Sequence, residues 1–424
     1  MHICEKIYCR SFQAALRAAL PVLPYRKPKL LKSIHCLPVL FRQKHIRRVL
    51  LITDASIRGV GITKPLEQAF RDAGIDCFVY DRTVANPTSD NVEQARALYQ
   101  NKHCQAVIGF GGGSSIDCAK AVGARIAKPK QQLADMEGIL KVHRRLPPLV
   151  AIPTTAGTGS EATLAAVITD SKTRHKYPIN DFPLIPHYVV LDPDVTISLP
   201  PSVTATTGMD ALTHAVEAYI GRSTTAETRA DAIRAVQLIF QNIDRAYQTG
   251  TDRTARSHML RAAYLAGSAF SKSYVGYVHA VAHSLGGKYN IPHGLANAIL
   301  LPHVLEAYGP AAQKKLAELA AAVGIHANSE QQAAQAFIQQ IREMKLRLHI
   351  PDVIPEIQAK DVPALARTAA KEANPLYPVP VLMDTAALEQ FYYAVMEEKD
   401  EIRTYPQHRI QAKAILQQRH HTAS

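Results

Sequence analysis

The sequence has no long hydrophobic runs, no cysteine framework and no low-complexity tract. Its longest apolar runs, such as "NAILLP" and "PPLVAIP", are far shorter than the roughly 20 residues that span a bilayer, so we expect no membrane span. The six cysteines form no CxxC pair and show no regular spacing. In a chain of this length, that pattern predicts free thiols in a reducing, cytoplasmic compartment.

Acidic residues are scarce near the N-terminus, where residues 1–48 hold eleven Lys and Arg but only Glu5, and the whole chain has a net charge of +13. No nucleic-acid motif accompanies this charge, so we expect a solvated surface and no specific nucleic-acid partner. The Arg-rich N-terminus also resembles a transit peptide. However, "LPYRKPKLL" is typical of extended structure and soon leads into a strong strand, so we expect it to belong to the fold.

The chain of 424 residues is too long for one ordinary core, and its 47% hydrophobic and 20% charged residues describe a folded globular protein. From Arg47 to about Pro200, short apolar runs such as "RRVLLIT", "DCFVY", "QAVIGF" and "PLVAIP" alternate with amphipathic helical patterns. Beyond that point, alanine-rich stretches with helical periodicity dominate. We therefore predict an α/β domain with a parallel sheet over residues 1–200 and an all-α domain over residues 201–424.

Small residues follow two of the predicted strands. "QAVIGF" runs into Gly111, Gly112, Gly113 and Ser114, and the loop "PTTAGTGSEAT" (153–163) follows the next buried strand. Such loops at the carboxyl ends of parallel strands let the backbone approach the phosphates of a dinucleotide at a helix N-terminus. Neither loop has the GxGxxG pattern, and a three-glycine turn alone is equally compatible with a structural role.

Asp54 ends the first strong strand, in "LLITD". A carboxylate there can accept hydrogen bonds from ribose hydroxyl groups and repel a 2′-phosphate, which would favour NAD over NADP. An Asp that ends a strand is as often only the cap of the next helix. The spacing leaves both roles open.

Histidines cluster in "HAVAHSLGGKYNIPHG" (279–294). His279 and His283 are four residues apart and share a helix face, and His293 follows a turn that could bring it back beside them. Asp210 and His214 are also four apart, in "GMDALTHAVEA". One carboxylate with several imidazoles suits Zn²⁺ or Fe²⁺, whereas Ca²⁺ or Mg²⁺ would need more oxygen ligands. One such pair is often a surface coincidence, but two pairs after a dinucleotide-type domain indicate a metal site.

Several longer motifs resemble those of the iron-containing (group III) alcohol dehydrogenases. They are "GGGSSIDCAK", "PTTAGTGSEAT", "LDPDVTISLPP", "TGMDALTHAVEAY", "HAVAHSLGGKYNIPHGLANAILLPHV" and "NPLYPVPVLMD". The resemblance runs from about Leu23 to residue 400. It implies the dehydroquinate synthase-like fold of that family, with an NAD-binding α/β domain followed by a helical metal-binding domain.

The resemblance also implies roles for single residues. The metal ligands would be Asp210, His214, His279 and His293. His283 would then not be a ligand but would lie near the nicotinamide and handle a proton. The residues implied to bind the cofactor are Asp54, Asn86, Gly111, Gly112, Gly113, Ser114, Asp117, Thr154, Thr155, Thr158, Thr163, Lys176 and Leu191.

The implied reaction is hydride transfer between a primary alcohol, or its aldehyde, and NAD(H), with the alcohol oxygen bound to Fe²⁺ or Zn²⁺. The resemblance also implies a homodimer or larger homo-oligomer. Alternatives within the superfamily are a polyol dehydrogenase and the related synthase that acts on a cyclic phosphate with bound NAD. A metal hydrolase is an alternative from another class, but the sequence lacks an HExxH motif for its general base.

Overall fold

The computed structural model describes residues 1–397, whose contacts divide them into two compact units. The sheet unit comprises residues 22–212 and 238–271, and the helical unit comprises residues 1–21, 213–237 and those from 272 onward. Three long helices contribute residues to both units: α7 (Pro201–Ile220), α8 (Ala226–Gln248) and α9 (Arg253–Ser273). The expected change from α/β to helical structure is confirmed, while a domain boundary near residue 200 stays a prediction.

The sheet unit contains a six-stranded parallel sheet with the order β1-β9-β6-β4-β2-β3. Its strands are β1 (Lys29–Leu31), β2 (Arg48–Ile52), β3 (Asp76–Tyr80), β4 (Ala106–Gly111), β6 (Leu149–Pro153) and β9 (Tyr188–Val190). The four apolar runs quoted from the sequence form β2, β3, β4 and β6, as predicted. Because these strands are parallel, their carboxyl ends lie at one edge of the sheet.

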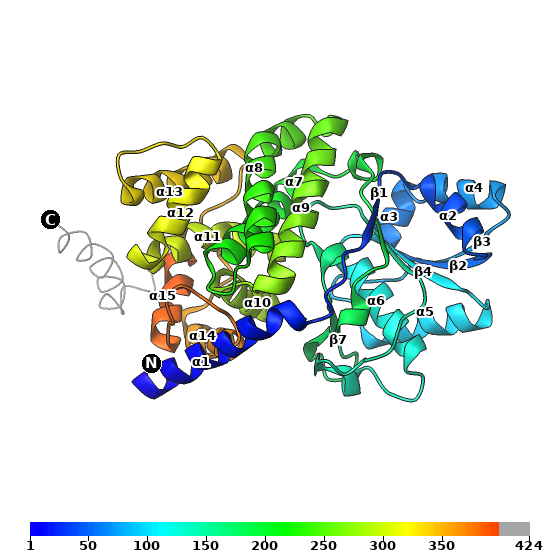
Figure 1. The fold of residues 1–424 in the computed structure, drawn as a ribbon, viewed down its shortest axis with the longest axis horizontal. Coiled ribbons are helices and arrows are strands. Elements are labelled where there is room, and N and C mark those ends of the chain that lie inside the picture. The colour runs from blue at the N-terminus through cyan, green and yellow to red at the C-terminus, as the bar shows by residue number, and fades with distance from the viewer. Residues whose placement is uncertain (398–424) are drawn as a thin grey trace. The chain divides into compact units, whose positions relative to one another are not determined.

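Helices cover both faces of this sheet, with α2 and α4 on one side and α5 and α6 on the other (Figure 1). The helices between β1 and α7 are α2 (Cys36–Gln43), α3 (Ala55–Val60), α4 (Lys64–Asp72), α5 (Ser89–Asn101) and α6 (Gly113–Ala127). In β2, Leu50 and Ile52 pack into the core beneath α5 and α6, and Val49 and Leu51 pack into the core beneath α2 and α4. A strand buried on both faces explains why β2 is apolar at successive positions.

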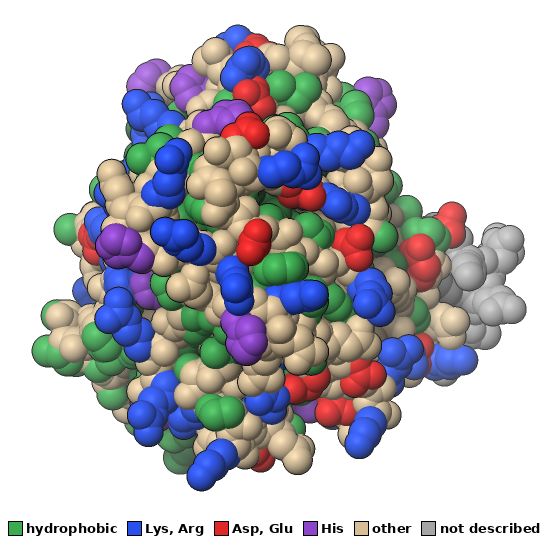
Figure 2. Space-filling model, turned by 90° about the vertical axis from the view of Figure 1, so that its right-hand side faces the viewer, with side chains coloured by type: hydrophobic (Ala, Val, Ile, Leu, Met, Phe, Trp, Pro, Cys, Tyr) green, Lys and Arg blue, Asp and Glu red, His purple; other side chains and the backbone are tan. Residues whose placement is uncertain are grey.

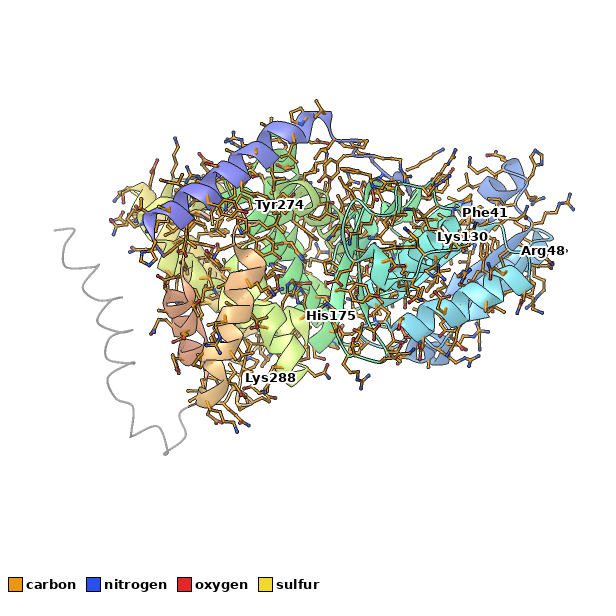
Figure 3. The ribbon with its side chains drawn as sticks, turned by 90° about the horizontal axis from the view of Figure 1, so that it is seen from below. Phe41, Arg48, Lys130, His175, Tyr274 and Lys288 are labelled. Carbon is orange, nitrogen blue, oxygen red and sulfur yellow. The ribbon has the colours of Figure 1, made fainter. Side chains whose placement is uncertain are left out.

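Phe41 of α2 illustrates the packing of these layers (Figure 3). Its ring is stacked parallel to that of Phe70 in α4, with ring centroids 5.6 Å apart, and both side chains are fully buried. Replacing one of them with Ala would destabilise the fold by about 3–5 kcal/mol.

A second, three-stranded sheet lies in the same unit and is not predicted by the sequence pattern. It consists of β5 (Gly138–Ile139), β7 (Ala165–Thr169) and β8 (Lys176–Asn180), in the order β5-β8-β7. Its strands are short: β5 has only two residues, and β8 (KYPIN) contains a proline, so neither has the continuous apolar run that reveals a strand of the main sheet.

The helical unit contains the remaining long helices. They are α1 (Ile3–Ala19), α10 (Tyr277–Tyr289), α11 (His293–Tyr308), α12 (Pro310–Ala322), α13 (Glu330–Arg347), α14 (Val362–Ala373) and α15 (Thr385–Val395). Short 3₁₀ turns join elements along the chain: η1 (Leu20–Val22), η2 (Ala134–Met136), η3 (Ser160–Ala162), η4 (Phe182–Leu184), η5 (Pro193–Thr196) and η6 (Ala359–Asp361). The alanine-rich periodicity beyond residue 200 therefore predicts the right type of element.

The N-terminal residues are folded, as expected, although the sequence pattern indicates the extended segment and not the helix before it. Gln13 of α1 is buried, and its Nε2 donates to the carbonyl oxygens of Pro375 and Tyr377 at 3.0 and 2.7 Å. Arg10 Nη1 donates to Val379 O at 2.8 Å. These contacts hold α1 against residues 375–380 of the same unit.

The surface drawn in Figure 2 carries Lys and Arg side chains scattered among neutral and acidic ones. All six cysteines, which lie within the described residues, are free thiols. Within residues 1–397, each helix is too short or too polar to cross a bilayer.

Candidate metal and cofactor site

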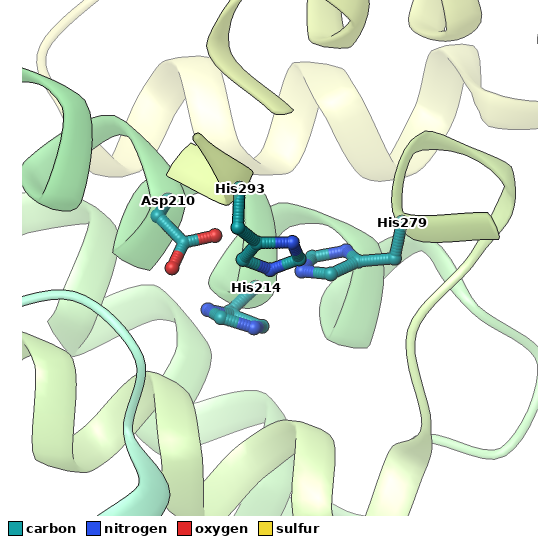
Figure 4. Close-up of side chains that lie close together, drawn as sticks. All are labelled: Asp210, His214, His279 and His293. Atoms are coloured by element: carbon teal, nitrogen blue, oxygen red, sulfur yellow. The ribbon is translucent and has the colours of Figure 1, made fainter. Parts of the chain in front are cut away.

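Four side chains that the sequence predicts as ligands converge at one point: Asp210, His214, His279 and His293 (Figure 4). Their potential ligand atoms all lie within 4.8 Å of one another. The ring centroids of His214 and His279 are 4.3 Å apart, and those of His279 and His293 are 5.4 Å apart. The first three side chains are buried and His293 is half-buried. One carboxylate and three imidazoles form a donor set that fits Fe²⁺ or Zn²⁺.

Local helix geometry explains this convergence. Asp210 and His214 lie one turn apart on α7, so they share a face of that helix. His279 lies in the first turn of α10, which ends at Asn290 in the left-handed conformation. Pro292 follows and His293 opens α11, so a tight reversal of the chain returns an imidazole to His279.

Burial lowers the pKa of His279 well below its ordinary value, and the neighbouring His214, His293 and His283 rings lower it further. An imidazole with a lowered pKa stays neutral near pH 7, and the neutral form is the one that binds a metal. The crowding of rings that would be unfavourable for charged histidines therefore suits neutral ligands.

Glu217 holds His279 in place, and the sequence reasoning did not single it out. Its Oε2 lies 2.6 Å from His279 Nδ1 and accepts from Gly276 N at 2.9 Å, while its Oε1 accepts from Val278 N at 2.8 Å. If Nδ1 carries the proton that Glu217 accepts, the nitrogen a metal would bind is Nε2. Burial raises the pKa of Glu217 to about 7, although these hydrogen bonds oppose that shift. The helical spacing of Asp210, His214 and Glu217 could have identified Glu217 from the sequence.

His283 lies beside the four converging residues but is not one of them. Its ring is stacked with that of His293 at a centroid distance of 5.0 Å, and its side chain is 39% exposed. His283 Nδ1 lies 2.6 Å from Glu372 Oε1, which also accepts from Tyr377 OH at 2.7 Å. The sequence reasoning missed Glu372, because it lies 89 residues further along the chain and in no motif.

The two loops of small residues lie side by side in the sheet unit, as predicted. They follow β4 and β6, which are neighbours in the sheet, and Thr154 N donates to Gly111 O at 3.0 Å. A Cβ atom on Gly113 would lie 3.1 Å from Thr158 Cγ2, and one on Gly112 would lie 3.5 Å from Thr155 Oγ1. Ser114 stands in the first turn of α6. The loops thus present backbone and small side chains at a helix N-terminus, the arrangement that suits a phosphate.

Gly111 shows why glycine is needed there. Its φ of 152° is rarely adopted by other residues, and a Cβ atom would lie 2.6 Å from Ser115 Oγ. Leu191 directly follows β9, and its N donates to Leu31 O at 2.9 Å.

Asp54 caps α3, because its Oδ1 accepts from Ile57 N at 2.9 Å. Its Oδ2 would lie 3.7 Å from a Cβ atom on Gly111, so the carboxylate also lies near the phosphate-type loop. The cap is therefore observed, and binding of ribose stays a prediction. Asn86 has a left-handed conformation and accepts from Lys176 Nζ at 2.7 Å, which brings two further predicted residues together.

Asp117 is half-buried, and its carboxylate bonds to other groups of the protein. It accepts from Ser160 Oγ at 2.5 Å and from Val167 N at 3.0 Å, and burial raises its pKa. These bonds fix the second loop to α6, so contact between Asp117 and a pyrophosphate stays a prediction.

Lys120 fixes the same loop and was not predicted. Its fully buried ammonium donates to Ser160 O at 2.6 Å, Thr163 O at 2.9 Å, Thr163 Oγ1 at 3.0 Å and Ala165 O at 2.7 Å. Burial lowers its pKa to about 8 and raises that of the neighbouring Glu161 to about 7. Thr163 is thus held by Lys120.

Comparison with known proteins agrees with this arrangement. Residues 31–193 match the iron-containing alcohol dehydrogenases, and residues 204–396 match the C-terminal region of the Fe-containing alcohol dehydrogenase family. Alcohol dehydrogenase 4 of Schizosaccharomyces pombe is 39% identical over 339 residues, which cover 78% of this chain and 79% of the relative. The NAD-dependent methanol dehydrogenase of Bacillus methanolicus is 34% identical over 335 residues, which cover 78% and 88%.

The fold agrees as well. A crystal structure of 1,3-propanediol oxidoreductase superposes with a TM-score of 0.84 at 34% identity, covering 87% of this chain and 98% of the other. Family matches over both halves, these identities and the Asp/His cluster point the same way. The chain belongs to the iron-containing alcohol dehydrogenase family.

Proposed function

We propose that this NAD-dependent oxidoreductase interconverts primary alcohols and their aldehydes, with Fe²⁺ held by Asp210, His214, His279 and His293. The observation that supports it most is the convergence of these four side chains within 4.8 Å. The relatives, which include a methanol dehydrogenase and a 1,3-propanediol oxidoreductase, favour short alcohols. Zn²⁺ fits the same donor set and is the alternative metal.

When bound, the metal supplies Lewis acidity toward the alcohol oxygen and NAD⁺ supplies the hydride acceptor. The chain supplies the rest. Glu217 holds Nδ1 of His279, so that Nε2 would be the nitrogen available to a bound metal. The loops at Gly111–Ser114 and 153–163 would hold the pyrophosphate, and Asp54 the adenosine ribose.

His283 is the residue that we assign to proton transfer. Its ring touches that of the proposed ligand His293, yet its side chain is 39% exposed, so a proton could pass between the site and solvent. Glu372 fixes Nδ1, which leaves Nε2 to exchange the proton. The alcohol proton would thus leave through His283.

The test is a panel of methanol, ethanol, 1-butanol, 1,3-propanediol and glycerol with NAD⁺, on protein loaded separately with Fe²⁺ or Zn²⁺. We expect NADH formation with the primary alcohols, higher activity with Fe²⁺ than with Zn²⁺, and none after chelation. Activity with glycerol alone would support the polyol dehydrogenase alternative instead. Ester hydrolysis without NADH formation would contradict the proposal. A homodimer or larger assembly and a cytoplasmic location stay predictions.

A further inference from the structure

A cavity of about 490 Å³ in the helical unit is lined by positively charged side chains. Arg17, Arg222, Arg229 and Lys315 contribute to its wall, together with the uncharged Ile220 and Thr224. None of the described residues that line it is acidic. Its volume lies within the range of about 300–1,000 Å³ that is typical of small-molecule sites.

Four separate stretches of chain bring these cations together. Arg17 comes from α1, which Arg10 and Gln13 hold against residues 375–380. Arg17 lies seven residues, or two helical turns, after Arg10, so it lies on the same face of α1. Arg222 follows the end of α7, and its backbone N donates to Pro378 O at 2.7 Å. Arg229 lies in the first turns of α8, and Lys315 lies on α12.

Lys315 has a structural role in the wall of this cavity. Its ammonium donates to Ile220 O at 3.2 Å and to Gly221 O, so it caps the C-terminal carbonyl groups of α7. Burial lowers the pKa of Lys315 to about 8, and the charges of Arg229, Arg17 and Arg222 lower it further, against the opposing effect of Glu318. These effects agree with the position of the three arginines and Lys315 in the wall of one cavity.

The three arginines lack the partners that other arginines in the protein have. Arg253 pairs with Asp194 at 2.6 Å and Arg342 pairs with Glu306 at 2.6 Å. Across residues 1–397, by contrast, the side chains of Arg17, Arg222 and Arg229 make neither an ion pair nor a hydrogen bond. Like charges that line one cavity repel each other, and a bound anion would relieve this repulsion.

We propose that this cavity binds a small organic anion of the phosphate-ester class, carrying two or more negative charges. Guanidinium groups match phosphate oxygens in pairs, which favours a phosphate over a single carboxylate. Ala311, in the first turn of the 13-residue helix α12, also lines the cavity, so the positive end of that helix adds to the attraction. This site lies in the helical unit and is separate from the loops proposed for NAD, which lie in the sheet unit.

The experiment is calorimetric titration of the metal-loaded protein with fructose 1,6-bisphosphate and, separately, with inorganic phosphate, at constant ionic strength. NADH is kept saturating, so that the cofactor loops cannot take up the probe. We expect saturable binding of the bisphosphate at one site per chain, and weaker binding of inorganic phosphate. In the double variant Arg222→Gln/Arg229→Gln, the Kd should rise at least about tenfold. Both side chains are exposed, so folding should be retained.

Arg234→Gln/Arg367→Gln is the matched control, because it removes the same two charges from exposed positions on α8 and α14 that do not line the cavity. Its Kd should stay within about twofold of the wild-type value, since distant sites act independently. The proposal is overturned if no saturable binding occurs, if the control loses as much affinity as Arg222→Gln/Arg229→Gln, or if the probe binds only when NADH is absent. Alcohol oxidation is measured separately, so failure here leaves the proposed activity untouched.

Discussion

At the scale of single residues, His279 and His283 share a helix but have different surroundings. His279 is buried beside Glu217, whereas the side chain of His283 is 39% exposed and lies beside Glu372. A spacing of four residues puts both rings on one face but cannot tell which of them is a ligand. Both rings contact a carboxylate, so the difference lies in burial and in the position of His279 beside Asp210 and His214.

We predict that His283→Ala keeps its metal but loses about 100-fold or more in kcat, because proton transfer by a positioned side chain contributes about that much. The pH–rate profile should also change, since a titrating group is removed. Metal content is measured by elemental analysis and kcat by NADH formation. His326→Ala, at an exposed position, is the control. A loss of metal from His283→Ala would show that His283 is a ligand.

Glu217→Gln should lower the affinity for metal about 10- to 100-fold. A glutamine whose oxygen still accepts from Val278 N places its NH₂ group where Oε2 stood, so it loses the bond from Gly276 N and offers an N–H to His279 Nδ1. That contact favours the tautomer with the proton on Nε2, the wrong one for a ligand. Metal competition titrations measure the affinity, and the visible spectrum of the Co²⁺-substituted protein reports the ligand change. Glu318→Gln, which removes the charge of a carboxylate that accepts from Tyr219 OH, is the control. An unchanged spectrum and affinity would refute this role.

At the scale of helices and strands, Asp54 lies at the junction between β2 and α3, and its role as a helix cap limits which substitution can test cofactor choice. Asp54 caps α3, so its removal would also weaken the helix. Asp54→Asn keeps a side-chain acceptor for the cap and removes only the charge. We expect the wild type to prefer NAD over NADP by about 100-fold in kcat/KM, because like charges in a partly desolvated site repel each other.

In Asp54→Asn that preference should fall at least about tenfold, while the melting temperature changes little. Initial rates with both cofactors measure the ratio. NADH binding can be followed by fluorescence without energy transfer from tryptophan, which the chain lacks. If the ratio is the same in both proteins, Asp54 serves only as a helix cap.

The second loop, residues 153–163, packs against α9, and this contact between two elements can also be tested. Gly159 has a φ of 62°, and a Cβ atom there would lie 2.6 Å from the Cα atom of Gly267 in α9. We predict that Gly159→Ala destabilises the protein by about 2–5 kcal/mol, because the substitution combines a strained backbone with a clash. NADH binding should weaken too, since the loop must move.

Chemical denaturation measures the loss of stability in Gly159→Ala. Gly59→Ala serves as the comparison, because Gly59 lies in α3 with no atom within 4 Å of the added Cβ. It should be neutral or stabilising by up to about 1 kcal/mol. If the two variants are equally stable, close contact between the second loop and α9 does not contribute to the stability of the protein.

At the scale of the whole molecule, metal binding couples three helices, because α7, α10 and α11 all supply proposed ligands. We predict that chelation lowers the melting temperature by a few degrees and that Fe²⁺ or Zn²⁺ restores it, since metal at 100 times its Kd adds about 2.7 kcal/mol. In His279→Ala, added metal should no longer raise the melting temperature. If the His279→Ala protein responds to metal as the wild type does, His279 is not a ligand.

The sequence alone determined the main elements and most of the site. Apolar runs revealed β2, β3, β4 and β6, of which β2, β4 and β6 are buried on both faces, as strands inside a parallel sheet between helices need to be. The resemblance of the motifs implied Asp210, His214, His279 and His293 as ligands, and the structure brings these four side chains together. Helical spacing alone left His279 and His283 equivalent.

Tertiary structure decided what depends on residues that are distant along the chain. Glu372 lies 89 residues from His283, and Arg17 and Lys315 are nearly 300 residues apart although they line one cavity. No local period links such residues, because only packing of the folded chain brings them together. The same holds for Lys120. The sequence around it does not show that its ammonium is buried, whereas in the fold this group donates to Ser160 O and Ala165 O.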